Sequence, residues 1–109
     1  MTVARLRPLA EADLVERTRY YRREAGERVG QRFFDAAIAA LRTMERLPHA
    51  GSPRAGELCD IPGLRGLRIA GFPCGWFYFV RTDDAAVDVV RLLAYTQDLS
   101  AILGELDPE

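Results

Sequence analysis

The sequence predicts an α+β fold in which a strand and a helical hairpin precede a three-stranded antiparallel meander and a short closing helix, in the order β-α-α-β-β-β-α. Two long helical patterns come first, in residues 10–25 and 29–47. Three strand-like runs then follow between turn residues, in residues 64–70, 75–81 and 87–94. Because helices and strands are segregated along the chain and do not alternate, this order is typical of an α+β domain with an antiparallel sheet.

Length and hydropathy predict one domain without a membrane segment. A chain of 109 residues is near the commonest domain size, so we expect a single domain over residues 1–109. The longest apolar runs are far shorter than the roughly 20 residues that cross a bilayer. No apolar stretch follows the arginines of the amino terminus, as a secretory signal requires. We therefore expect a cytoplasmic protein.

The first element is expected to be a short strand over residues 3–7 at an edge of the sheet. Pro8 ends it, because proline has no N–H group to continue a hydrogen-bonded ladder. Apolar residues then recur at helical spacing from Ala10 to Ala25, which predicts the first helix. Gly26 is expected to end that helix.

The second helix is expected over residues 29–47, because its apolar residues form one face over about five turns. These residues are Val29, Phe33, Ala36, Ala37, Ala40, Leu41, Met44 and Leu47. Pro48 ends the helix, since the residue before a proline avoids the α region. The two helices form a hairpin, and neither can bury its apolar face without the other helix and the sheet.

The remaining segments are a long loop, the meander and the closing helix. Residues 49–62 contain several prolines and glycines and are expected to form an irregular loop. Loops of this length tend to be functional or mobile. The strand 75–81 is apolar on both faces and should lie centrally in the sheet. Asp98 is expected to cap the closing helix.

The charged residues restrict the chemistry that the chain can perform. All fifteen basic residues are arginine, so no lysine is available as a general base. The net charge of −1 argues against broad electrostatic attachment to a polyanion. Residues 1–47 carry ten arginines against seven acidic residues, whereas residues 48–109 carry five against nine. A surface with one basic side and one acidic side suits protein partners better than nucleic acid.

No metal or cofactor site is expected. Cys59 and Cys74 match no zinc-ligand spacing, and His49 is the only histidine that could join them. The sequence leaves open whether the two cysteines lie close enough to form a disulfide.

The chain resembles the ParE branch of the RelE/ParE toxin superfamily over almost its whole length, through a set of short segments in a fixed order. These segments are Ala12-Asp13-Leu14, the helical pattern from Phe33 to Leu47, Leu47-Pro48-His49-Ala50-Gly51, Gly63-Leu64-Arg65, Trp76-Phe77-Tyr78, Val90-Arg91-Leu92-Leu93 and Gln97-Asp98-Leu99. Each segment alone is a weak signal, but their order and spacing together are fairly specific.

The resemblance implies the toxin of a type II toxin–antitoxin module, which a cognate antitoxin neutralises by folding its carboxyl-terminal segment around the toxin. ParE-like members are associated with inhibition of DNA gyrase, growth arrest and plasmid stabilisation. RelE-like members cleave mRNA on the ribosome without a metal. A member that has lost its toxicity and only binds an antitoxin is a third alternative.

The candidate site residues are four arginines of the strands and a tyrosine that follows the last strand. They are Arg65, Arg68, Arg81, Arg91 and Tyr95. In the protein-binding interpretation, these residues contact the target or the antitoxin. In the nuclease interpretation, Arg68, Arg91 and Tyr95 are catalytic. The two arginines would stabilise the charge of the phosphate, and Tyr95 would donate a proton or stack on a base.

The missing group for RNA cleavage is the base that removes the 2′-OH proton. Without lysine, the candidates are His49 and Glu57, both in the predicted loop. The sequence therefore favours an inhibitor that binds its target over an enzyme.

Strand alternation also predicts how the candidate arginines are oriented. Arg65 and Arg68 are three residues apart and should face opposite sides of the sheet. Arg91 should share a face with Val87, Val89 and Leu93.

Overall fold

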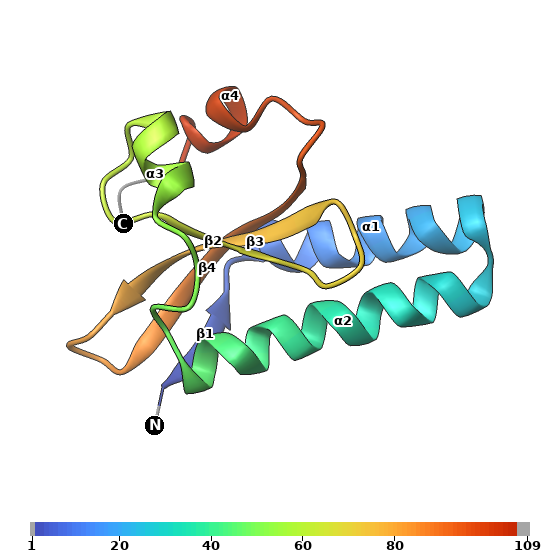
Figure 1. The fold of residues 1–109 in the computed structure, drawn as a ribbon, viewed down its shortest axis with the longest axis horizontal. Helices are drawn as coiled ribbons and strands as arrows, with labels where there is room; N and C mark the ends of the chain where they lie inside the picture. The colour runs from blue at the N-terminus through green and yellow to red at the C-terminus, as the bar shows by residue number, and fades with distance from the viewer. Residues whose placement is uncertain (1, 107–109) are drawn as a thin grey trace.

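The computed structural model describes residues 2–106 and confirms the predicted α+β fold (Figure 1). The elements are β1 (Val3–Leu6), α1 (Pro8–Ala25), α2 (Glu27–Arg46), α3 (Arg54–Cys59), β2 (Arg65–Arg68), β3 (Cys74–Arg81), β4 (Ala86–Ala94) and α4 (Leu99–Leu103). Of the helices in this part of the chain, none has both the length and the apolar character needed to cross a membrane.

The four strands form one sheet in the order β1-β4-β3-β2. β2, β3 and β4 are antiparallel neighbours, as the meander predicted, and β3 is central. β1 lies at an edge, also as expected, but it pairs with β4 in the parallel direction. The direction of β1 had no signal in the sequence, because no turn joins it to β4 and the whole helical hairpin lies between β1 and the meander.

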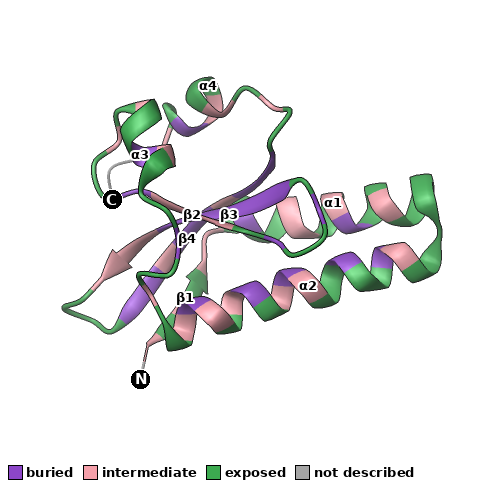
Figure 2. Ribbon diagram, viewed as in Figure 1, coloured by how far each residue is buried: buried purple, intermediate pink, exposed green. Residues whose placement is uncertain are grey.

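The helical hairpin packs on one face of the sheet, and the larger core lies between the two. α1 and α2 run side by side in opposite directions, and their buried residues face the sheet (Figures 1 and 2). Trp76 of β3 is fully buried there, and its indole N–H donates a hydrogen bond of 3.0 Å to the carbonyl of Ala37 in α2. The rings of Tyr21, Phe33 and Phe72 contact one another at the outer end of this core.

The opposite face of the sheet carries a second, smaller core under α3 and α4. Its buried residues are Leu64, Phe77, Val90, Leu93 and Leu103. α4 begins as expected, because the Asp98 carboxylate accepts a hydrogen bond of 3.2 Å from the backbone N–H of Ala101.

The prediction of an irregular loop over residues 49–62 is wrong, because α3 lies within it. α3 has only six residues, too few to display a helical apolar pattern in the sequence. Tertiary packing supports it. A Cβ atom added to Gly56 would lie 2.6 Å from the carbonyl oxygen of Leu64, so only glycine allows this helix to lie so close to the chain that enters β2.

A bulge in β4 changes the orientation expected for Arg91. Tyr78 of β3 pairs with Val89 and Phe77 pairs with Arg91, so Val90 is an extra residue. The prediction that Arg91 shares a face with Val87 and Val89 is therefore wrong, because the bulge reverses the alternation between them. Leu93 lies beyond the bulge and shares the face of Arg91, as predicted.

The two cysteines do not form a disulfide. Cys74 is a free thiol in the core under the helical hairpin, where its sulfur lies 3.6 Å from the hydroxyl of Tyr21. Cys59 is also free and packs against the second core, on the other side of the sheet.

Candidate functional site

An apolar groove lies on the face of the sheet that α1 and α2 leave uncovered. It runs between α3, the start of α4 and the strands β2 and β3, and has a volume of about 280 Å³. Its lining residues are Ser52, Arg54, Ala55, Leu58, Gly66, Phe77, Tyr95 and Leu99. Leu58 is 70% exposed and presents its side chain to solvent at the wall of the groove. We call this feature the sheet groove.

Two local features form the floor and one wall of the sheet groove. Gly66 has no side chain, and a Cβ atom at this position would lie 3.1 Å from the ring of Phe77, so glycine leaves the floor low. Ser52 and Gly66 exchange two backbone hydrogen bonds of 2.9 Å, each N–H donating to the other carbonyl. This bridge fixes the chain that enters α3 along the edge of β2.

Arg68 and Tyr95 lie together at one end of the sheet groove. The guanidinium carbon of Arg68 is 5.3 Å from the ring centroid of Tyr95, a cation–π contact. Tyr95 needs a glycine beneath it, since a Cβ atom at Gly75 would lie 2.5 Å from its hydroxyl oxygen. Burial raises the pKa of Tyr95, and the nearby charge of Arg68 offsets part of this rise. At neutral pH the hydroxyl is therefore protonated and can donate a hydrogen bond.

Arg65 faces the other side of β2 from Arg68, as strand alternation predicted, and it is occupied with the chain that follows α2. Its guanidinium donates to the backbone carbonyls of His49 and Gly51. The same segment is held by the hydroxyl of Tyr78, which donates to the carbonyl of Pro48 and accepts from the N–H of Gly51, both at 2.9 Å. Arg65 therefore positions residues 48–51 and is not directed into the sheet groove.

Arg91 forms an ion pair with α1. Its guanidinium binds the carboxylate of Asp13 through two hydrogen bonds, of 2.7 and 2.9 Å, and both side chains are about four-fifths buried. The hydrogen bond to Asp13 is the main reason that the pKa of Arg91 is raised. A partner molecule would have to displace Asp13 to reach this charge.

Arg81 lies at the opposite end of β3 from the sheet groove. It shares the carboxylate of Asp88 with Arg7, at 3.3 Å from Arg81 and 2.8 Å from Arg7. Burial alone would raise the pKa of Asp88, but the hydrogen bonds and charges of the two arginines outweigh it and lower the pKa.

The structure therefore brings together only two of the five predicted site residues, Arg68 and Tyr95. The two candidate bases lie elsewhere. In the described part of the chain, neither His49 nor Glu57 lines the sheet groove: His49 follows the end of α2, and Glu57 lies on the side of α3 that faces residues 60–64. Residues 2–106 also contain no cluster of three or more side chains able to hold a metal ion.

The apolar lining of the sheet groove was not predicted as a site. Leu58 lies in the segment predicted as a loop, Leu99 in the predicted closing helix and Phe77 in the predicted central strand. The available signal was Leu58 itself, a large apolar residue in a segment rich in proline, glycine and charge.

A second groove lies between α1 and α2. It has a volume of about 390 Å³ and is lined by Val15, Thr18, Arg19, Arg22, Gln31 and Phe34. Val15 and Phe34 are exposed, whereas the hydroxyl of Thr18 is buried and has no hydrogen-bond partner among residues 2–106. We call this feature the hairpin groove.

Comparisons with known proteins agree with this fold. The family model described as "ParE toxin of type II toxin-antitoxin system, parDE" matches residues 4–99. Eleven chains of solved structures also match. One belongs to the chromosomal ParDE TA system from P. aeruginosa; it is 18% identical, with a TM-score of 0.71, over 86% of this chain and 96% of that chain. A search of curated proteins finds no match.

Proposed function

This chain belongs to the ParE toxin family of type II toxin–antitoxin systems, and on that basis we propose that it inhibits DNA gyrase by binding it and is neutralised by a cognate antitoxin. We further propose that residues 1–109 act as one toxin domain and that the protein works in the cytoplasm. The proposed activity requires recognition of a protein surface and no chemical turnover by the toxin.

The apolar character of the sheet groove carries this proposal. Cleavage of RNA through its 2′-OH needs a base close to the cations that stabilise the phosphate. Beside Arg68, the groove offers the protonated hydroxyl of Tyr95 and a lining that is mainly carbon, with neither His49 nor Glu57. Such a surface is better suited to an apolar side chain of a partner protein than to a scissile phosphate.

The exposed residues of the sheet groove suggest how a protein partner would bind. Leu58 and Leu99 would contact an apolar side chain inserted against Phe77. Arg54, at the groove, and Arg68, beside Tyr95, are both exposed and would pair with carboxylates that flank that side chain. Buried apolar anchors together with tyrosine and arginine are the residues that dominate binding energy at protein interfaces.

For the antitoxin, we propose the hairpin groove as a docking surface. Val15 and Phe34 would contact the apolar face of an antitoxin helix, and Arg19 would pair with an acidic residue of that helix. The buried hydroxyl of Thr18 lacks a partner in residues 2–106, and a polar group of the antitoxin could supply one.

A supercoiling assay with purified gyrase tests the proposed target. The isolated toxin should inhibit supercoiling, and prior addition of the antitoxin should restore it. Leu58→Asp should abolish inhibition, because it places a charge at the wall of the sheet groove. If the toxin arrests growth but leaves gyrase fully active, the proposed target is wrong.

The exposed pair of Arg68 and Tyr95 keeps a second function open, cleavage of mRNA on the ribosome. In that case, primer extension on translated mRNA would reveal new cuts within codons, and Arg68→Ala would remove them. If toxic expression produces no such cuts, the nuclease function is excluded. Harmless expression would instead favour a non-toxic member that only binds its antitoxin.

A further inference from the structure

Two exposed tyrosines on this molecule each make cation–π contacts with arginine. Tyr20 of α1 is 40% exposed, and the guanidinium carbons of Arg17 and Arg23 lie 4.9 and 6.0 Å from its ring centroid. Tyr95, after β4, is 39% exposed and lies 5.3 Å from the guanidinium carbon of Arg68. Neither Tyr20 nor its two arginines line either of the grooves described above.

The two tyrosines are connected through the turn that follows β4. The Nη2 atom of Arg17 donates a hydrogen bond of 3.5 Å to the side-chain oxygen of Gln97. That oxygen also accepts a hydrogen bond of 2.8 Å from the backbone N–H of Ala94, which fixes its position. Tyr95 lies within this turn. The middle of α1 is therefore attached to the turn that carries the second tyrosine, and we call Arg17, Tyr20, Arg23, Arg68 and Tyr95 the arginine–tyrosine surface.

The charges of this surface are available to a ligand. No carboxylate in residues 2–106 forms an ion pair with Arg17 or Arg68. Arg23 lies 3.7 Å from Glu24, but both side chains are more than half exposed, and such a pair contributes little. The surface is therefore locally positive although the net charge of the whole chain is −1.

We infer that the arginine–tyrosine surface binds single-stranded nucleic acid. Exposed tyrosine rings and guanidinium planes are platforms on which unpaired bases stack, and the same guanidinium groups pair with phosphates. A duplex hides its base faces and could use only the charges. The carboxylates of an acidic protein segment would likewise pair with the arginines but would not stack on the aromatic rings. The combination of rings and cations therefore favours the unpaired strand over both.

This binding does not depend on gyrase being the target. It is also distinct from RNA cleavage, because stacking and phosphate contact require no base at the site. Only a few phosphates can be contacted by three arginines, so we expect modest affinity and a shallow dependence on salt, with a slope of log K against log salt of about −2.

Fluorescence anisotropy with the full chain tests this inference. Labelled oligo(dT) and oligo(U) of about 15 nucleotides, close to the upper site size of single-strand binding folds, distinguish DNA from RNA as the ligand. Both Tyr20→Leu and Tyr95→Leu should weaken binding about tenfold, because each removes one stacking platform. Arg17→Gln should reduce the magnitude of the salt slope by about 0.7.

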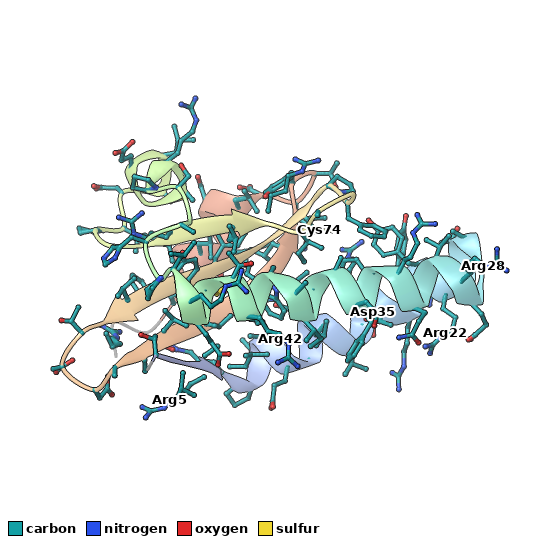
Figure 3. All side chains as sticks on the ribbon, turned by 60° about the horizontal axis from the view of Figure 1, so that its bottom comes forward. Arg5, Arg22, Arg28, Asp35, Arg42 and Cys74 are labelled. Atoms are coloured by element: carbon teal, nitrogen blue, oxygen red, sulfur yellow. The ribbon has the colours of Figure 1, made fainter. Side chains whose placement is uncertain are left out.

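Two matched variants control for general effects. Phe34→Leu removes an exposed aromatic ring from α2, and Arg42→Gln removes an exposed arginine from α2. Figure 3 shows Arg42 pointing away from Cys74, the residue that contacts Tyr21 of α1. Both controls should bind the oligonucleotides as the parent chain does. Thermal unfolding of each variant establishes that a loss of binding is not a loss of fold.

Three results would overturn the inference. The first is no binding of either oligonucleotide at low salt. The second is equal affinity for a duplex of the same length, which would mean that stacking has no role. The third is that a polyglutamate peptide binds and neither oligonucleotide does. If Arg17→Gln and Tyr20→Leu weaken binding of that peptide, the partner is an acidic protein.

Discussion

Asp13 of α1 joins the helical hairpin to the sheet through Arg91 of β4. Its carboxylate accepts two hydrogen bonds from the Arg91 guanidinium and a third, of 3.0 Å, from the backbone N–H of Leu92. β1 ends at Leu6, so β4 continues beyond its edge neighbour. Asp13 therefore supplies a hydrogen-bond acceptor to β4 where the strand ladder has stopped.

Replacing Asp13 should destabilise the fold strongly. Asp13→Ala leaves a mostly buried guanidinium and a backbone N–H without their partner, and we expect a loss of about 2–4 kcal/mol in the free energy of unfolding. Urea unfolding measures this loss. Glu11→Ala, at an exposed acidic residue of the same helix, is the control and should change stability by less than about 0.5 kcal/mol. Similar losses for both variants would contradict the role given to Asp13.

Acid should weaken the contact between β1 and β4 through Asp88. The pKa of Asp88 is lowered below its ordinary value of 3.8, so its contribution to stability is present above that value and is lost as pH falls through the lowered pKa. Asp88→Asn should therefore be less stable than the parent at neutral pH, and the difference should shrink as pH falls below about 4. Urea unfolding as a function of pH measures this. A difference that stays constant across the acid range would contradict the prediction.

The sheet groove should tolerate a charge without loss of stability. Leu58 is mostly exposed, so Leu58→Asp should change the free energy of unfolding by less than about 0.5 kcal/mol while abolishing gyrase inhibition. Leu9→Asp, at an exposed leucine of α1 outside the sheet groove, is the matched control and should retain inhibition. Equal inhibition by the two variants would mean that the toxin uses another surface.

The position of Tyr95 should depend on Gly75. Gly75→Ala introduces a Cβ atom 2.5 Å from the Tyr95 hydroxyl oxygen and 3.2 Å from the carbonyl of Leu67, and we expect a loss of about 1–3 kcal/mol. In a Tyr95→Phe background the same substitution should cost less, because the contact with the hydroxyl is gone and the remaining contacts, with the Leu67 carbonyl and the Cζ atom of the ring, are both at 3.2 Å. A double-mutant cycle from urea unfolding measures the coupling. Additive effects would contradict the proposed contact.

The fold was predictable to a large extent because its elements carry strong local patterns. The α2 pattern around Phe33 and Met44, the stop at Pro48 and the doubly apolar β3 all correspond to structure within a few residues. The missed helix α3 is short and depends on Gly56 fitting against Leu64, a contact that no local pattern reports. The bulge at Val90 was missed for a similar reason, since it exists only in the pairing of β4 with β3.

The candidate site was less predictable than the fold. Arg65, Arg81 and Arg91 are all strand arginines, and in the sequence they resemble Arg68. In the structure Arg65 holds backbone carbonyls, while Arg81 and Arg91 pair with carboxylates from other parts of the chain. The side chains that surround an arginine decide whether its charge is free, and those neighbours are brought there by folding.

Residue order alone was therefore enough to predict the class of fold, the place of the central strand and the resemblance to a toxin family. These properties depend on spacing and propensity within each element, which act locally. Tertiary packing decided the direction of β1, the presence of α3 and the contact between Arg68 and Tyr95 beside an apolar groove. Each of these depends on contacts between residues distant in the chain, whose geometry is fixed only when both faces of the sheet are covered.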